Sequence, residues 1–164
     1  MRMEEELEIV TGRWRALSEI LAILDRAGGE VTGRSTAQLL YFAGKDLGRR
    51  ESAAYDRTED LERALGWVFP GRDEVWKVSL WKNQEDEDYW VFEAEEMMVK
   101  LLFEECPLRR SCLASGIPLG GVACQAVHGY AAGMLQEIFG RRVDLQTQHA
   151  GPGACLVVLR TTLE

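Results

Sequence analysis

Histidine and cysteine are scarce in this sequence, and they are unevenly placed. Among 164 residues there are only two histidines and four cysteines, and all six lie between Cys106 and Cys155. The first 105 residues contain neither type. Because these side chains are the usual soft metal ligands, their confinement to one third of the chain predicts a local site there.

Excess positive charge and long apolar runs are also missing. The formal net charge is -8, which argues against a nucleic-acid surface and against binding to anionic membranes. No run approaches the roughly 20 apolar residues of a membrane span, and the acidic start MRMEEELE is not a signal peptide. We therefore expect a cytoplasmic protein with no nucleic-acid partner. Its thiols should stay reduced, as free cysteines or metal ligands rather than disulfides.

The glycine-rich loops that bind nucleotide phosphates are absent as well. Neither G-x-G-x-x-G nor G-x-x-x-x-G-K-[ST] occurs, so nucleotide chemistry has no support. The segment SGIPLGG, residues 115–121, precedes a helix start and could seat an anion on backbone N–H groups. Its glycines could equally serve only the turn. Arg109 and Arg110 could pair with a ligand carboxylate or simply be solvated.

The residues that are present suffice for one domain over 1–164 with a real core. Hydrophobic residues make up 46% of the chain, and five of them are tryptophans. In the first 70 residues, apolar side chains recur at three- and four-residue steps, which predicts helices packed on that core. The expected helices cover residues 4–27, ended by Gly28 and Gly29, then 35–48, and then Asp56 or Thr58 to Pro70.

After residue 70 the period changes from helical to alternating. The pattern predicts a strand, a return strand that forms a hairpin with it across a polar turn, and a third strand. A loop, a long helix and a final pair of strands follow. The first three strands are expected at 75–81, 89–92 and 96–105, and the loop at 111–121. The long helix is expected at 121–139 and the final pair of strands at 143–149 and 155–159. The fold class predicted is α+β, with an antiparallel sheet of four to five strands and helices packed on one face.

Four of the scarce side chains are predicted to converge. On the long helix, Cys124 and His128 share a face with apolar residues, so they should point at the sheet. On the last two strands, His149 and Cys155 have the parity of inward-facing residues. Two thiolates and one or two imidazoles meeting at one point are typical of tetrahedral zinc. Cys106, at a strand end, is a further candidate ligand.

Two other interpretations of these side chains stay open. The cysteines could be inert, buried thiols and His128 a satisfied core histidine. Cys124 and His128, one helical turn apart, could act as nucleophile and base. Cys112 is expected to be a loop thiol outside the site.

The C-terminal third resembles a known family. The run C-x3-H-GYAAG-x5-FG over residues 124–140, followed by a strand and a short glycine-containing hairpin ending at Cys155, is similar to the 4-vinyl reductase domain. The resemblance implies an α/β sandwich with an antiparallel sheet, a fold also seen in subunits of vesicle-tethering complexes. It further implies binding of small molecules or hydrocarbons. In phenol-responsive sensors of this family a zinc ion lies beside the pocket and the domains dimerise.

The resemblance places possible zinc ligands by position. The helical ligand falls on Cys124 and the last on Cys155, while His149 replaces a cysteine between them. The family's acidic ligand falls near Gln146, which is a poor zinc ligand. Cys106, His128 or water could complete the set.

The main hypothesis is therefore a protein that binds a small hydrophobic or aromatic hydrocarbon-like ligand, with zinc as its cofactor and a homodimer as its assembly. The pocket is expected between the long helix and the sheet. Candidate ligand-binding residues are His128, Trp76, Trp81 and Trp90. The alternatives are an enzyme acting on a tetrapyrrole or other planar substrate, and a structural oligomerisation or tethering module. If the protein is a sensor, we expect its output to be a partner protein.

Overall fold

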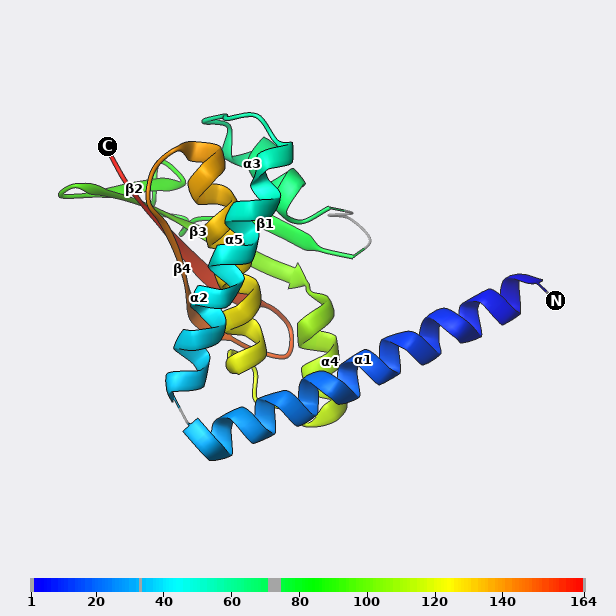
Figure 1. Cartoon of the computed structure of the whole chain (residues 1–164). Coiled ribbons are helices and arrows are strands. Elements are labelled where there is room, and N and C mark those ends of the chain that lie inside the picture. The colour runs from blue at the N-terminus through cyan, green and yellow to red at the C-terminus, as the bar shows by residue number, and fades with distance from the viewer. Residues whose placement is uncertain (1, 33, 71–74, 164) are drawn as a thin grey trace.

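The structure is a computed structural model, and it describes residues 2–32, 34–70 and 75–163. Within these ranges helices come first, strands follow, and a long helix interrupts the strands (Figure 1). The elements are α1 (Arg2–Thr32), α2 (Arg34–Glu51), the 3₁₀ turn η1 (Ser52–Ala54), α3 (Leu61–Val68), β1 (Lys77–Trp81), β2 (Trp90–Glu93), β3 (Glu96–Glu105), α4 (Pro107–Ser115), α5 (Val122–Phe139), β4 (Val143–Ala150) and β5 (Cys155–Thr162).

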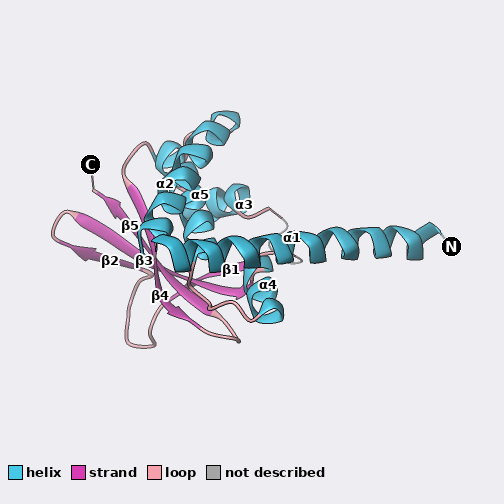
Figure 2. Ribbon diagram, turned by 60° about the horizontal axis from the view of Figure 1, so that its bottom comes forward, coloured by secondary structure: helices cyan, strands magenta, loops and turns pink. Residues whose placement is uncertain are grey.

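The strands form one antiparallel sheet in the order β1-β3-β5-β4, with β2 also paired to β3. Alternate residues of β3 are buried, namely Val99, Leu101 and Phe103, because successive strand side chains point to opposite faces. On that face lie α2, α3 and α5, as Figures 1 and 2 show. The α+β class and the sheet with helices on one face, both predicted from the sequence, are confirmed.

The predicted hairpin of β1 with β2 is wrong. β1 pairs with the second half of β3, from Lys100 to Glu105. β2 pairs with the first half, so the two short strands lie end to end along one edge. The actual hairpin joins β2 to β3 through a two-residue turn, Ala94 and Glu95, in which Ala94 adopts a left-handed φ of 52°. The ten-residue β3 is long enough to give each short strand its own partner stretch.

Helix α1 differs from its predicted length and environment. It continues through Gly28 and Gly29 to Thr32, since a glycine in a helix costs only about 1 kcal/mol. Its N-terminal half projects away from the body (Figures 1 and 2), and the prediction that this helix packs on the core is wrong for seven of its apolar side chains. These exposed residues are Ile9, Val10, Leu17, Ile20, Ile23, Leu24 and Val31. Despite its length, neither α1 nor another helix in the described part of the chain could cross a membrane.

Helices α2 and α5 cross with their backbones in contact. Glycines make this possible, because Gly129 of α5 lies directly against the carbonyl of Tyr41 in α2. A Cβ atom at Gly129 would sit 1.9 Å from that oxygen, and one at Gly44 would sit 2.2 Å from the carbonyl oxygen of Ala126. Pairs of glycines spaced by four residues on both helices extend the contact. The tight crossing sets the position of α5 over the sheet, and with it the position of the site described below.

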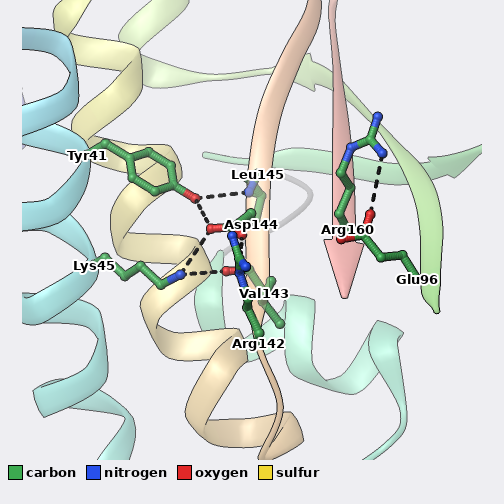
Figure 3. Close-up of polar contacts among 8 residues, drawn as sticks. All are labelled: Tyr41, Lys45, Glu96, Arg142, Val143, Asp144, Leu145 and Arg160. Atoms are coloured by element: carbon green, nitrogen blue, oxygen red, sulfur yellow. Dashed lines mark hydrogen bonds and ion pairs between the residues drawn. The ribbon is translucent and has the colours of Figure 1, made fainter. Parts of the chain in front are cut away.

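A polar network fixes α2 to β4 (Figure 3). The ammonium of Lys45 lies 3.1 Å from the Asp144 carboxylate and donates to the Val143 carbonyl at 2.8 Å. The Tyr41 hydroxyl donates to Asp144 at 3.3 Å and accepts from the Leu145 N–H at 3.1 Å. Burial alone would raise the pKa of Asp144, but the hydrogen bond and positive charge of Lys45 hold that pKa below its usual value. The carboxylate is therefore ionised and holds the helix to the strand.

Candidate functional site

A cavity lies beneath the first turns of α5, between α4 and the ends of β3, β4 and β5. Its volume is about 430 Å³ when the open mouth is included. The centre of a water molecule can occupy only about 30 Å³ of that space. That smaller volume corresponds to about two waters. A mostly apolar wall with few polar groups is typical of small-molecule sites. The lining residues are Trp76, Phe103, Cys106, Leu108, Arg109, Leu119, Gly120, Cys124, Val127, His128, Thr147, Ala150, Cys155 and Val157.

One wall of the cavity is α4, a helix where the sequence predicted the start of a loop. Pro107 occupies its first turn, and Gly116 ends it with a left-handed φ of 67°. Proline at a helix start and glycine just past its end are the signal that could have identified this helix. Helical spacing turns Leu108, Arg109 and Cys112 to the same side, so that the first two line the cavity and Cys112 is buried.

Three of the four cysteines line the cavity, namely Cys106, Cys124 and Cys155, which the sequence suggested as zinc ligands. They come from the end of β3, the first turn of α5 and the start of β5. Cys112, predicted to be a loop thiol outside the site, is buried and interacts with Cys124. The interaction of the two thiols lowers the pKa of Cys112 and, together with burial, raises the pKa of Cys124, while burial raises the pKa of Cys106. Cys106 and Cys124 are therefore neutral at neutral pH.

His149 does not join these thiols. A β-bulge at Gln148 shifts the register, so Thr147 pairs with Val157 whereas His149 pairs with Leu156. The extra residue inverts the alternation of side chains. His149 therefore lies on the opposite face from Thr147, and it is exposed.

The residues seen here do not form a complete zinc site. Within residues 2–32, 34–70 and 75–163, no group of three or more His, Cys, Asp or Glu side chains could hold a metal ion. Three thiols surround one cavity, but His149 points away and Gln146 is exposed. Zinc binding stays a prediction, and metal analysis of the purified protein tests it.

Among the four predicted ligand-binding residues, His128 and Trp76 line the cavity. His128 is buried, and its Nδ1 lies 3.4 Å from the Thr147 hydroxyl. Burial lowers the pKa of His128 to about 4. Its imidazole is therefore neutral at neutral pH and offers one N–H donor and one acceptor.

The other two predicted tryptophans lie elsewhere. Trp81 borders a separate hollow together with Tyr89 and Met98. Trp90 packs against the hydrophobic core and is not part of the cavity lining. Strand alternation explains the placement of Trp81, because it is five residues from Trp76 and thus faces the opposite side of the sheet.

The N-terminus of α5, considered above as an anion seat, is occupied by a carboxylate of the protein itself. Asp25 of α1 accepts the Val122 N–H at 3.0 Å. A second link between α1 and the cavity wall is the 2.9 Å hydrogen bond from Ser18 to Ser111 of α4. Asp25 thus caps one helix from another and attaches the C-terminal half of α1 to the site.

We expect Asp25→Ala to lower the free energy of unfolding by about 1 kcal/mol, the usual value of a lost helix cap. Asp25→Asn keeps a side-chain oxygen that can accept the Val122 N–H, so most of the stability should remain. Urea denaturation of both variants measures the difference. An equal loss in the two would contradict the capping role.

Two solved structures resemble this fold. The phenol-responsive sensory domain of the transcription activator PoxR, solved with phenol, matches with a TM-score of 0.57 and 15% identity over 89% of this chain and 74% of that chain. A trafficking protein particle complex subunit 3 from Naegleria fowleri, covalently bound to palmitic acid, matches with a TM-score of 0.48 and 15% identity over 90% of this chain and 96% of that chain. No family model matches the sequence, and no curated protein matches it significantly. The match to PoxR confirms the predicted likeness in fold to phenol-responsive sensory domains. Membership of the 4-vinyl reductase family stays a prediction.

Proposed function

We propose that this protein binds a small, largely apolar organic molecule in the cavity between α4, α5 and the sheet. The observation that carries the proposal is the cavity lining, in which apolar side chains surround a few polar groups. The likeness in fold to a phenol-responsive sensory domain supports it. Trp76 supplies an aromatic wall, and neutral His128 supplies a hydrogen bond to a ligand hydroxyl or carbonyl.

Binding of a one-ring molecule requires the lining to move. The space open to water centres is only about 30 Å³, which is less than such a molecule needs. Small shifts of side chains at an interface are common on binding. Leu108 and Leu119 are flexible apolar side chains of the lining that are only half-buried, so we expect them to take part in this movement.

A phenol titration followed by ¹H–¹⁵N NMR tests the proposal. In the wild type, we expect shifts concentrated at the Trp76 indole and around His128. Ala150→Phe fills the cavity from β4 and should abolish them. Gln146→Phe adds the same ring at an exposed position of the same strand and should leave them unchanged. Shifts that persist in Ala150→Phe would contradict binding in this cavity.

We further propose that the protein forms a homodimer through α1. Val10, Leu17, Leu24 and Val31 recur every seven residues and are all exposed, and a seven-residue apolar repeat is typical of helices that pack along one seam. The projection of α1 away from the body leaves that seam accessible to a second copy of the chain (Figure 2).

We expect the double substitution Leu17→Glu and Leu24→Glu to produce a monomer. The two carboxylates would be buried in the proposed seam, where charge is costly. Sedimentation velocity measures the change, with Glu19→Gln on the same helix as a control that should remain dimeric. A wild-type protein that sediments as a monomer at all accessible concentrations would contradict the dimer.

A further inference from the structure

We propose that the ligand of this cavity carries a carboxylate and that Arg109 pairs with it. The inference rests on the proposed function and adds a chemical class to it. Arg109 is only 6% exposed, yet it belongs to the lining of the cavity. A guanidinium stays charged at all physiological pH values. Burying it without an anion costs several kcal/mol.

The described contacts of Arg109 are to neutral groups only. Its guanidinium donates to the Phe103 carbonyl at 3.0 Å and to the Glu104 carbonyl. These two bonds satisfy part of a group that has five N–H donors. Neither bond brings a negative charge to the guanidinium, and both tie α4 to the end of β3.

The nearby carboxylates are paired with other cations. Glu104 forms an ion pair with Lys77 at 3.2 Å, and Glu105 forms one with Arg110 at 2.7 Å. Both pairs lie near the surface, and no ion pair joins Arg109 to a carboxylate anywhere in the described ranges 2–32, 34–70 and 75–163. The carboxylate that approaches from α1 caps α5 instead.

Neither Cys106 nor Cys124 supplies the missing negative charge. Cys106 and Cys124 share the cavity lining with Arg109, and the pKa of each is raised as described above. A neutral thiol is a weak acceptor and cannot balance a guanidinium. We therefore expect the counter-charge to come from an anionic ligand that enters the cavity.

The geometry of the guanidinium selects the anion. Its planar fork of donors matches the two oxygens of a carboxylate. Neutral His128 in the same lining can donate a further hydrogen bond, while Trp76, Leu119 and Val127 surround the remaining space with apolar groups. The expected ligand is thus a small amphiphile, with a carboxylate at one end and an aromatic or aliphatic body.

The test compares each acid with its neutral amide, which has nearly the same shape. Affinities of benzoate and benzamide, and of hexanoate and hexanamide, are measured at pH 7.5 by NMR titration. In the wild type we expect each acid to bind at least tenfold more tightly than its amide. The better of the two acids then identifies the body of the ligand as aromatic or aliphatic.

Two substitutions assign that preference to a residue. Arg109→Gln should reduce the acid-to-amide ratio to about one. Arg110→Gln, which removes the neighbouring exposed guanidinium, is the matched control and should keep the wild-type ratio. The ratio compares two ligands on one sample, so a partly unfolded variant does not bias it. If Arg109→Gln does not fold, the wild-type ratio decides alone.

The two proposals fail in different ways. Equal binding of acid and amide in the wild type, or an unchanged ratio in Arg109→Gln, would overturn the pairing with Arg109 and leave the cavity as a site for neutral molecules. Binding that survives the cavity-filling Ala150→Phe would instead overturn the proposed function.

Discussion

Gly129→Ala is expected to lower the free energy of unfolding by about 3 kcal/mol, at the upper end of the cost of overpacking. The added methyl group would lie 1.9 Å from the Tyr41 carbonyl oxygen, far inside van der Waals contact. Backbone atoms cannot rotate away as side chains do, so α2 and α5 would have to separate. Urea denaturation measures the loss, and Gly48→Ala on the facing helix should give a similar value.

Gly29→Ala is the matched control for this substitution. Gly29 is also helical, but a methyl group there would meet nothing within 4 Å. Alanine in an open helical position is expected to stabilise by about 0.5–1 kcal/mol. A loss at Gly129 no larger than 1 kcal/mol, or an equal loss at both positions, would contradict the tight crossing of α2 and α5.

The second large effect expected is a loss of stability in mild acid that depends on His128. Burial lowers the pKa of this imidazole from 6.5 to about 4. Between these pH values the unfolded chain binds a proton at His128 and the folded chain does not, so stability falls as pH falls. The fall begins near pH 6.5 and is complete near pH 4. This shift in the pKa of His128 corresponds to a loss of about 3 kcal/mol in the free energy of unfolding.

His128→Gln isolates this contribution, because carboxylates also begin to titrate in the lower part of the range. The free energy of unfolding should depend less on pH between 6.5 and 4 in the variant than in the wild type. His149→Gln, at an exposed position, should reproduce the wild-type profile. Parallel profiles for the wild type and His128→Gln would show that the imidazole is not buried in its neutral form.

The sequence predicted best the elements whose apolar pattern is long and uninterrupted. The face of α5 that carries His128 was expected to contact the sheet, and Ala131, Leu135 and Ile138 on it are buried. The alternation of β3 was read correctly for the same reason. In both cases the period extends over ten or more residues, so few other structures fit it.

Where the pattern was short or locally irregular, the sequence was a poor guide. The nine-residue helix α4 contains only about two and a half turns of periodicity, so Cys112 was expected in a loop and Arg109 was left either solvated or paired with a ligand. A single bulge at Gln148 moved His149 to the other face, and no periodicity encodes such a bulge. The stripe on α1 is apolar, but an apolar stripe does not reveal whether it packs on the rest of the chain or is exposed, as Val10, Leu17 and Leu24 are.

The residues of the site could be predicted only in part, for the same reason. Cys124 and Cys155 were expected to lie close together from helix face and strand parity, and Cys106 was a further candidate at a strand end; all three line the cavity. Trp81 could not be excluded by type, since tryptophan is common in both ligand sites and cores. Its position in the alternation of the strand was the deciding signal.

The central claim is that a small molecule occupies the cavity beneath α5. Intermolecular nuclear Overhauser effects between phenol and the protein test it most directly. We expect contacts from the ring protons of phenol to His128 and Trp76. Contacts only to Trp81 and Tyr89, which border the separate hollow, would contradict it.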